Sequence, residues 1–146
     1  MKPLKILQRR PVSVPAFLFD LDGTLVDSVY YHVLAWREAL DEAGIPLSVW
    51  RIHRRIGMSG GLFVTALARE LGENLSAVEA LKLQHLHAAA FGRMASQVRP
   101  LPGARELLTH LTKAGVPWAI ATSGRMETAR PSLEILGVNP KKTVVI

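Results

Sequence analysis

The sequence predicts an α/β protein with a parallel sheet and a helical segment inserted after the first strand. Two continuous apolar runs, residues 16–19 and 116–122, have the length and composition of strands buried on both faces. A helical pattern follows the second run, whereas residues 46–96 contain helical patterns and no strand pattern. Strands that alternate with helices pair in parallel, so we expect one sheet with a helical insertion.

The first strand, Ala16 to Phe19, leads into two aspartates and a glycine. Alternate residues of an extended chain point to the same side, so Asp20 and Asp22 are expected to leave the strand close together. Gly23 permits a tight bend after them. Two adjacent carboxylates repel each other unless a cation neutralises them or one carries a proton. A magnesium-dependent phosphoryl-transfer site uses both devices.

The first helix is expected to begin after Asp27 or Ser28, either of which can cap it, and to end at Gly44. Its apolar residues recur at helical spacing: Val29, Val33, Trp36 and Leu40. Asp27 and Ser28 are interpreted as helix caps rather than ligands.

Three further helical stretches follow before the chain returns to the sheet. They are predicted at residues 48–56, 62–71 and 76–94, and the last begins with a capping box of Ser76 and Glu79. The predicted domains are therefore an α/β core of residues 1–28 and 97–146, and a helical cap of residues 29–96.

The rest of the core is predicted in the order helix, strand, helix, strand. Residues 103–114 form a helix with three inward leucines, 116–122 a strand, 126–136 a helix, and 143–146 the start of a third strand. The inward leucines are Leu107, Leu108 and Leu111.

Polar residues also follow the second strand. Thr122, Ser123 and Gly124 supply hydroxyls and free backbone N–H groups at the start of a helix. Ligands of open parallel sheets bind at the carboxyl ends of the strands. If the two strands are neighbours, carboxylates and phosphate-cradling groups face one crevice.

The composition limits the possible partners. The 146 residues are 49% hydrophobic, contain no cysteine, and carry a formal net charge of +6 from scattered basic residues. The absence of cysteine excludes disulfides, thiolate zinc sites and cysteine nucleophiles. We expect a cytoplasmic protein without a secretory signal, a membrane span, or a nucleic-acid or membrane partner.

Two motifs resemble those of the haloacid dehalogenase superfamily, in its phosphatase and β-phosphoglucomutase-like branch with a small helical cap. The run from Phe19 to Ser28 (FDLDGTLVDS) is similar to the first motif, and the run from Trp118 to Gly124 (WAIATSG) to the second. The cap helix opening at Tyr31 and the turn at 57–60 are also similar. The resemblance covers residues 16–146 and implies a Rossmann-like parallel core.

The resemblance also implies roles for individual residues. Asp20 would be the nucleophile that forms an aspartyl-phosphate, and Asp22 the general acid and base. Mg²⁺ would bind the Asp20 carboxylate and the Asp22 backbone carbonyl. Thr122 and nearby N–H groups would hold the phosphoryl oxygens. The remaining implied phosphate-binding or substrate-binding residues are Gly23, Ser123, Gly124 and His32.

Other histidines and one tryptophan receive more ordinary interpretations. Trp36 is predicted to lie mostly in the core, and His32 either at the hinge or beside the substrate. His85 and His87 are interpreted as surface or partly buried histidines without a metal.

Two further motifs of the superfamily, a lysine and a later acidic pair, are not matched; Lys141 and Lys142 precede a strand rather than follow one. We therefore expect a chain that is C-terminally truncated relative to full-length relatives. Such a chain would have an incomplete core, weak metal binding, and an exposed sheet edge that favours self-association.

The predicted function is a magnesium-dependent phosphatase acting on a small phosphorylated metabolite. One alternative is a sugar phosphomutase of the β-phosphoglucomutase type. The resemblance speaks against it at Gly60, because sugar phosphomutases carry a basic phosphate-binding residue at this turn position. The other is a catalytically impaired fragment. The sequence leaves open which substrate is used and the oligomeric state.

Overall fold

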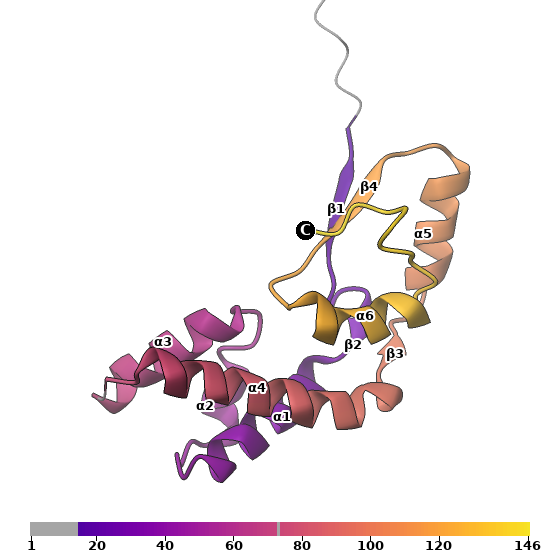
Figure 1. Ribbon diagram of the computed structural model, residues 1–146. Coiled ribbons are helices and arrows are strands. Elements are labelled where there is room, and N and C mark those ends of the chain that lie inside the picture. The colour runs from indigo at the N-terminus through magenta and orange to yellow at the C-terminus, as the bar shows by residue number, and fades with distance from the viewer. Residues whose placement is uncertain (1–14, 73) are drawn as a thin grey trace, which may run out of the picture.

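The computed structural model describes residues 15–72 and 74–146, and its sheet is parallel as predicted (Figure 1). Strands β1 (Phe17–Asp20) and β4 (Trp118–Ala121) pair in parallel, from Phe17 opposite Trp118 to Asp20 opposite Ala121. On the other side of β4, Ile120 forms a parallel bridge with Val145. The order β1, β4, C-terminal segment confirms the α/β fold class and the third strand position.

The expectation that the first strand is buried on both faces is wrong. Phe17 is 51% exposed and Leu18 is 62% exposed. The physical reason is that, among the described residues, β1 pairs with β4 alone and the faces of this narrow sheet are left open at Phe17 and Leu18. In β4 only Ile120 is fully buried.

Two helices pack beside the strands. Helices α5 (Ala104–Lys113) and α6 (Met126–Ile135) lie next to β1 and β4 in Figure 1. Leu108 and Leu111 are buried as predicted, but Leu107 is 41% exposed. The prediction for Leu107 failed because α5 turns only one face toward the core, and that face carries Ala104, Leu108 and Leu111.

The remaining helices gather at the end of the strands that carries the aspartates (Figure 1). They are α1 (Val29–Glu42), α2 (Val49–His53), α3 (Gly60–Leu71), α4 (Ala77–Met94) and the short 3₁₀ helix η1 (Ala95–Gln97). Their apolar residues form a cluster of their own around Trp36, Phe63 and Leu67. A second cluster joins the strands to α5, α6 and the near ends of α1 and α4. The second cluster also includes Ala35, Ala90 and Phe91 of α1 and α4, and the division into a core and a cap stays a prediction.

A short antiparallel pair of strands, which was not predicted, links the segment that enters the helical insertion to the segment that leaves it. Strand β2 (Val26–Asp27) pairs with β3 (Arg99–Pro100), and the Leu101 N–H donates to the Leu25 carbonyl at 3.0 Å. Two-residue strands are too short to give an alternating pattern. The pair holds the start and the end of the insertion together.

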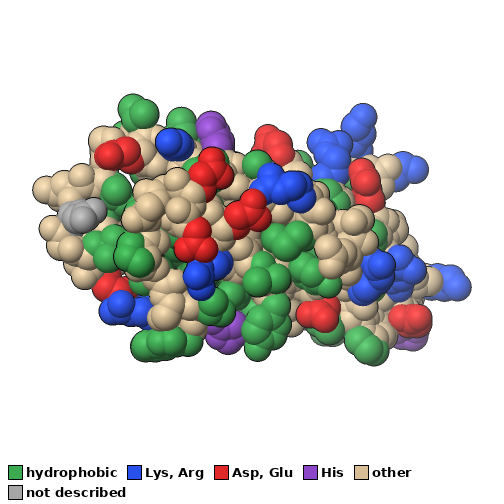
Figure 2. Space-filling model, turned by 90° about the horizontal axis from the view of Figure 1, so that it is seen from below, with side chains coloured by type: hydrophobic (Ala, Val, Ile, Leu, Met, Phe, Trp, Pro, Cys, Tyr) green, Lys and Arg blue, Asp and Glu red, His purple; other side chains and the backbone are tan. Residues whose placement is uncertain are grey.

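On the face seen in Figure 2, apolar side chains are exposed between acidic and basic ones, and Lys and Arg are most numerous toward one end. Within residues 15–72 and 74–146, no helix is both long and apolar enough to cross a membrane.

Candidate active site

The loop after β1 turns tightly and returns the chain toward α1. The Gly23 N–H donates to the Val26 carbonyl at 2.8 Å, and the Leu25 N–H donates to the Leu21 carbonyl at 2.9 Å. Gly23 has a φ of +77°, and a Cβ added there would lie 2.7 Å from Cγ2 of Val29. Both facts require glycine at this position. The loop therefore places Asp20 and Asp22 before the first turn of α1.

The two carboxylates have different surroundings. Asp20 is exposed, and Oγ1 of Thr24 donates to its Oδ2 at 3.2 Å. The Asp22 side chain is 25% exposed, and its Oδ1 accepts from Oγ of Ser28 at 2.6 Å and lies 3.2 Å from Nε2 of His32. One carboxylate is thus open toward solvent and the other is held by neighbours.

The predicted capping role of the Ser28 side chain is wrong. Ser28 occupies the N-cap position of α1, but its hydroxyl makes no capping bond and donates to Asp22 instead. Asp27 lies in β2 and does not cap the helix. The reason is that Ser28 is completely buried against a carboxylate, which is a strong hydrogen-bond acceptor.

His32, in the first turn of α1, links Asp22 to the helical segment. Its Nδ1 lies 3.2 Å from Nε2 of His87 on α4, and its ring stacks on Phe91 with centroids 4.0 Å apart. The His87 ring in turn stacks on Trp36, at 4.3 Å. His87 is partly buried as predicted, and it belongs to the pocket, which the sequence analysis did not anticipate. A lone histidine on a long helix gives no sequence signal for such a contact.

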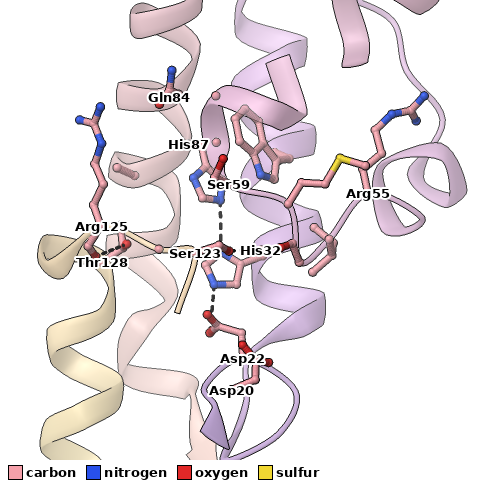
Figure 3. Close-up of a pocket in the computed structure, with 18 residues that line it drawn as sticks. Asp20, Asp22, His32, Arg55, Ser59, Gln84, His87, Ser123, Arg125 and Thr128 are labelled. Atoms are coloured by element: carbon pink, nitrogen blue, oxygen red, sulfur yellow. Dashed lines mark hydrogen bonds and ion pairs between the residues drawn. The ribbon is translucent and has the colours of Figure 1, made fainter. Parts of the chain in front are cut away.

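A pocket of about 320 Å³ lies between the strand ends and the helical segment (Figure 3). The predicted residues Asp20, Asp22, His32, Ser123 and Gly124 line it. Its wall also contains residues that were not predicted to belong to the site: Arg55, Ile56, Met58, Ser59, Gly61, Gln84, His87, Ala88, Arg125 and Thr128. Trp36, Gly57 and Gly60 complete the lining.

The end of β4 contributes as predicted, with one difference. Ser123 and Gly124 line the pocket, and the Ser123 hydroxyl donates to the Gly57 carbonyl of the helical segment at 3.2 Å. Thr122 is outside the lining, and its Oγ1 accepts from the Gly124 N–H at 3.1 Å. Gly23 also lies outside the lining, so its role is to shape the turn.

The surroundings lower the pKa of both Asp22 and His87, which favours the charged form of the carboxyl group and the neutral form of the imidazole. Burial raises the pKa of Asp22, but the hydrogen bonds and positive charge of His32 and the Ser28 hydroxyl outweigh it, so the net shift is below the usual 3.8. Burial lowers the pKa of His87 from 6.5 to about 3, with His32 adding to the effect. At neutral pH Asp22 is ionised and His87 is neutral.

Two arginines line the pocket. Arg55 forms an ion pair with Glu70, which also pairs with Arg51. Arg125, at the N-cap of α6, points along the pocket wall beside Thr128 (Figure 3). Both arginines lie just outside the segments that resemble family motifs, so neither was predicted to belong to the site.

Oxygen atoms from Asp20 and from the Asp22 backbone are of the kind that Mg²⁺ prefers. Within the described residues, no group of three or more His, Cys, Asp or Glu side chains is arranged to hold a metal ion. The residues present therefore fit a hard cation by chemistry and supply only part of a coordination shell.

A comparison with known protein families shows to which family the chain belongs. The family model for haloacid dehalogenase-like hydrolases matches residues 14–146. The chain belongs to this family. Its relatives include hexitol phosphatase A of Escherichia coli, 40% identical over 127 residues, and β-phosphoglucomutase of Bacillus subtilis, 29% identical over 115 residues. These matches cover 84% and 75% of this chain.

A solved structure agrees with the fold. A hydrolase from Pseudomonas syringae is 50% identical, superposes with a TM-score of 0.87, and matches over 90% of this chain and 60% of that one. The present haloacid dehalogenase-like chain covers 54% of hexitol phosphatase A and 51% of the β-phosphoglucomutase. It thus spans about half the length of the curated relatives that it matches.

Proposed function

We propose that the chain is the nucleophile-bearing part of a phosphatase that acts on a small phosphorylated metabolite. The observation that supports this most is that Asp20, Asp22, His32, Ser123 and Gly124 line one pocket where β1 and β4 end side by side. The phosphatase names among its relatives support the same reaction class.

In the proposed reaction, a carboxylate oxygen of Asp20 attacks phosphorus and the bond from phosphorus to the ester oxygen breaks. The leaving oxygen takes a proton from Asp22, and an aspartyl-phosphate remains. Water then attacks phosphorus, gives a proton to Asp22, and releases inorganic phosphate and the Asp20 carboxylate. Asp20 needs no base because a carboxylate is already a nucleophile.

Asp22 must hold a proton for the first step, although its lowered pKa favours the ionised form. A phosphate monoester has a second pKa near 6, so its monoanion brings a proton that passes to the Asp22 carboxylate before the bond to the leaving oxygen breaks. The hydrogen bonds from Ser28 and His32 keep Asp22 at one place in both steps.

The Asp20 carboxylate and the Asp22 backbone carbonyl would hold Mg²⁺. When bound, the ion would offset the negative charge of Asp20 and of the phosphoryl group. The backbone N–H groups at the start of α6 would donate to the phosphoryl oxygens, and the Ser123 hydroxyl would do so on leaving the Gly57 carbonyl.

The pocket favours a polyhydroxylated phosphate ester. A volume of about 320 Å³ suits a small metabolite, and neutral hydrogen-bonding side chains from Ser59, Gln84 and Thr128 face it. Hexitol phosphatase A, whose name specifies such an ester, is among the relatives.

The test is release of inorganic phosphate in the presence of Mg²⁺ from a hexitol phosphate, from phosphoglycolate and from an aryl phosphate. We expect release by the wild-type chain, release within twofold of it by Asp41→Asn, and none by Asp20→Asn. Asp41 is an exposed aspartate of α1, ion-paired with Arg37 at 2.7 Å and outside the pocket lining. Equal release by Asp20→Asn and the wild type would refute the assignment.

The same measurement separates a phosphatase from a phosphomutase. At Gly60 and Gly61 the pocket wall carries no side chain to bind a second phosphate. We therefore expect free phosphate from β-glucose 1-phosphate, if it reacts, rather than glucose 6-phosphate. Formation of the isomer without free phosphate would favour the mutase.

A further inference from the structure

A line of three side chains runs from the helical segment into the catalytic loop. His87 on α4 contacts His32 on α1, and His32 contacts Asp22 (Figure 3). Each contact joins two polar atoms at 3.2 Å. Asp22 and His32 are 25% and 16% exposed, so water has little room to replace either partner.

The direction of these hydrogen bonds follows from what each atom can do. A carboxylate only accepts, so Nε2 of His32 must carry the hydrogen that points at Oδ1 of Asp22. A neutral imidazole has one N–H, so Nδ1 of His32 is then an acceptor. With His32 neutral, the hydrogen between the two rings comes from Nε2 of His87. A neutral His87 can carry that hydrogen on Nε2.

The rings are also fixed in orientation. His32 lies flat on Phe91, with parallel planes and centroids 4.0 Å apart. His87 lies on Trp36 at 4.3 Å and 17°. Such stacking restricts rotation of both imidazoles, so the donor of His87 stays aimed at His32.

We propose that His87 is a positioning residue, which by donating from Nε2 fixes His32 in the tautomer that donates to Asp22. The inference rests on the proposed role of Asp22 in proton transfer. In this arrangement His32 and Ser28 both occupy Oδ1 of Asp22, which leaves Oδ2 as the oxygen that faces the leaving group and the attacking water.

The first test does not depend on activity. Two-bond ¹H–¹⁵N spectra of the uniformly labelled 146-residue chain at pH 7.5 report the tautomer of each histidine, and the His32 signals are assigned by their loss in His32→Asn. We expect His32 as the Nε2–H tautomer. Signals of the Nδ1–H tautomer, or of a ring protonated on both nitrogens, would overturn the proposal.

The second test uses two substitutions at one position. In Gln the side-chain amide nitrogen lies where His has Nε2, so His87→Gln keeps a donor, whereas His87→Leu removes it. We expect His87→Gln to retain the Nε2–H signature, and His87→Leu to show a mixture of tautomers. His85→Leu is the control, because His85 is exposed on the same helix. An unchanged His32 spectrum in a folded His87→Leu variant would overturn the proposal.

Kinetics then distinguish positioning from substrate binding. Loss of an outer hydrogen-bond partner typically lowers activity 10- to 100-fold. We expect His87→Leu to lower kcat by about that factor with KM changed less than about threefold, and His87→Gln to recover most of kcat. A raised KM with an unchanged kcat would show that His87 acts on the substrate and would overturn the proposal. If the wild-type chain releases no phosphate, the proposed function fails, while the tautomer measurement still decides the role of His87.

Discussion

At the scale of single residues, Ser28 shows how the site departs from local sequence rules. A serine before a helix is typically a cap, yet this hydroxyl donates to Asp22 at 2.6 Å. A sequence pattern describes neighbours along the chain, and Asp22 is six residues away across a turn. The same limit applies to His87, whose contact with His32 spans 55 residues. By contrast, Asp20 and Asp22 were predictable because their spacing and the glycine after them belong to one short segment.

The hydrogen bond from Ser28 is expected to stabilise the folded chain and to lower the pKa of Asp22. Ser28→Ala leaves a part-buried carboxylate with one donor fewer, so we expect a loss of about 1–3 kcal/mol in the free energy of unfolding. The pKa of Asp22 should rise, because a bond that lowers it is gone. Urea unfolding measures the first effect. Ser48→Ala, at an exposed N-cap without a side-chain capping bond, should change stability by less than about 0.5 kcal/mol.

His87 gives the protein a predicted sensitivity to acid. Its pKa is about 3 in the folded chain against an ordinary value of 6.5, so below pH 6.5 the unfolded chain binds a proton that the folded chain does not. Stability is therefore present above pH 6.5 and is lost as the pH falls from there toward about 3. Between pH 7 and pH 4.5 this loss amounts to at most about 3 kcal/mol.

Substitution isolates this contribution from the other groups that titrate, which near His87 are His32 and Asp22. We expect His87→Gln to lose less stability than the wild type between pH 7 and pH 4.5, as measured by urea unfolding at each pH. His85→Gln should follow the wild type. A pH dependence that His87→Gln leaves unchanged would contradict the burial argument.

At the scale of elements, the order of strands and helices was predictable and the short pieces were not. The helices lie where the apolar periodicity predicts them, and α4 begins at the predicted capping box of Ser76 and Glu79. The pair β2 and β3 was missed because it depends on the meeting of two distant segments. The burial of β1 was overestimated because an apolar run shows only that a strand is suited to burial. Whether it is buried depends on the elements that pack against it.

The turn between β1 and α1 is expected to tolerate no side chain at Gly23. Gly23→Ala forces an alanine to a φ of +77° and puts its Cβ 2.7 Å from Val29. Gly44→Ala is the matched control, with a φ of +71° and no atom within 4 Å of the added Cβ. We expect Gly44→Ala to cost about 1 kcal/mol from the backbone alone, and Gly23→Ala to cost about 2–4 kcal/mol. Equal thermal unfolding temperatures for the two variants would contradict the predicted clash.

At the scale of the whole molecule, one edge of the sheet is unpaired in the part of the chain that the structure describes. Within the described residues β1 pairs only with β4, and Phe17 and Leu18 on it are more than half exposed. Unpaired apolar edges template association with other chains. We therefore predict that self-association of this chain occurs at β1.

A charge on that edge should weaken the association. We expect the apparent mass in sedimentation to rise with concentration for the wild type and to stay near 16.0 kDa for Leu18→Lys. Leu62→Lys on α3 is the control, because Leu62 is also 62% exposed and lies away from the sheet. If both variants associate like the wild type, the edge is not the contact.

The central claim is that Asp20 attacks phosphorus from the carboxyl end of β1. It is tested most directly by quenching the reaction with borohydride during turnover of a hexitol phosphate, since borohydride reduces an acyl phosphate to the alcohol. The account predicts homoserine at position 20, only in the presence of substrate, as read from the mass of the peptide that contains it. Homoserine at position 22, or unmodified Asp20 while phosphate is being released, would contradict it.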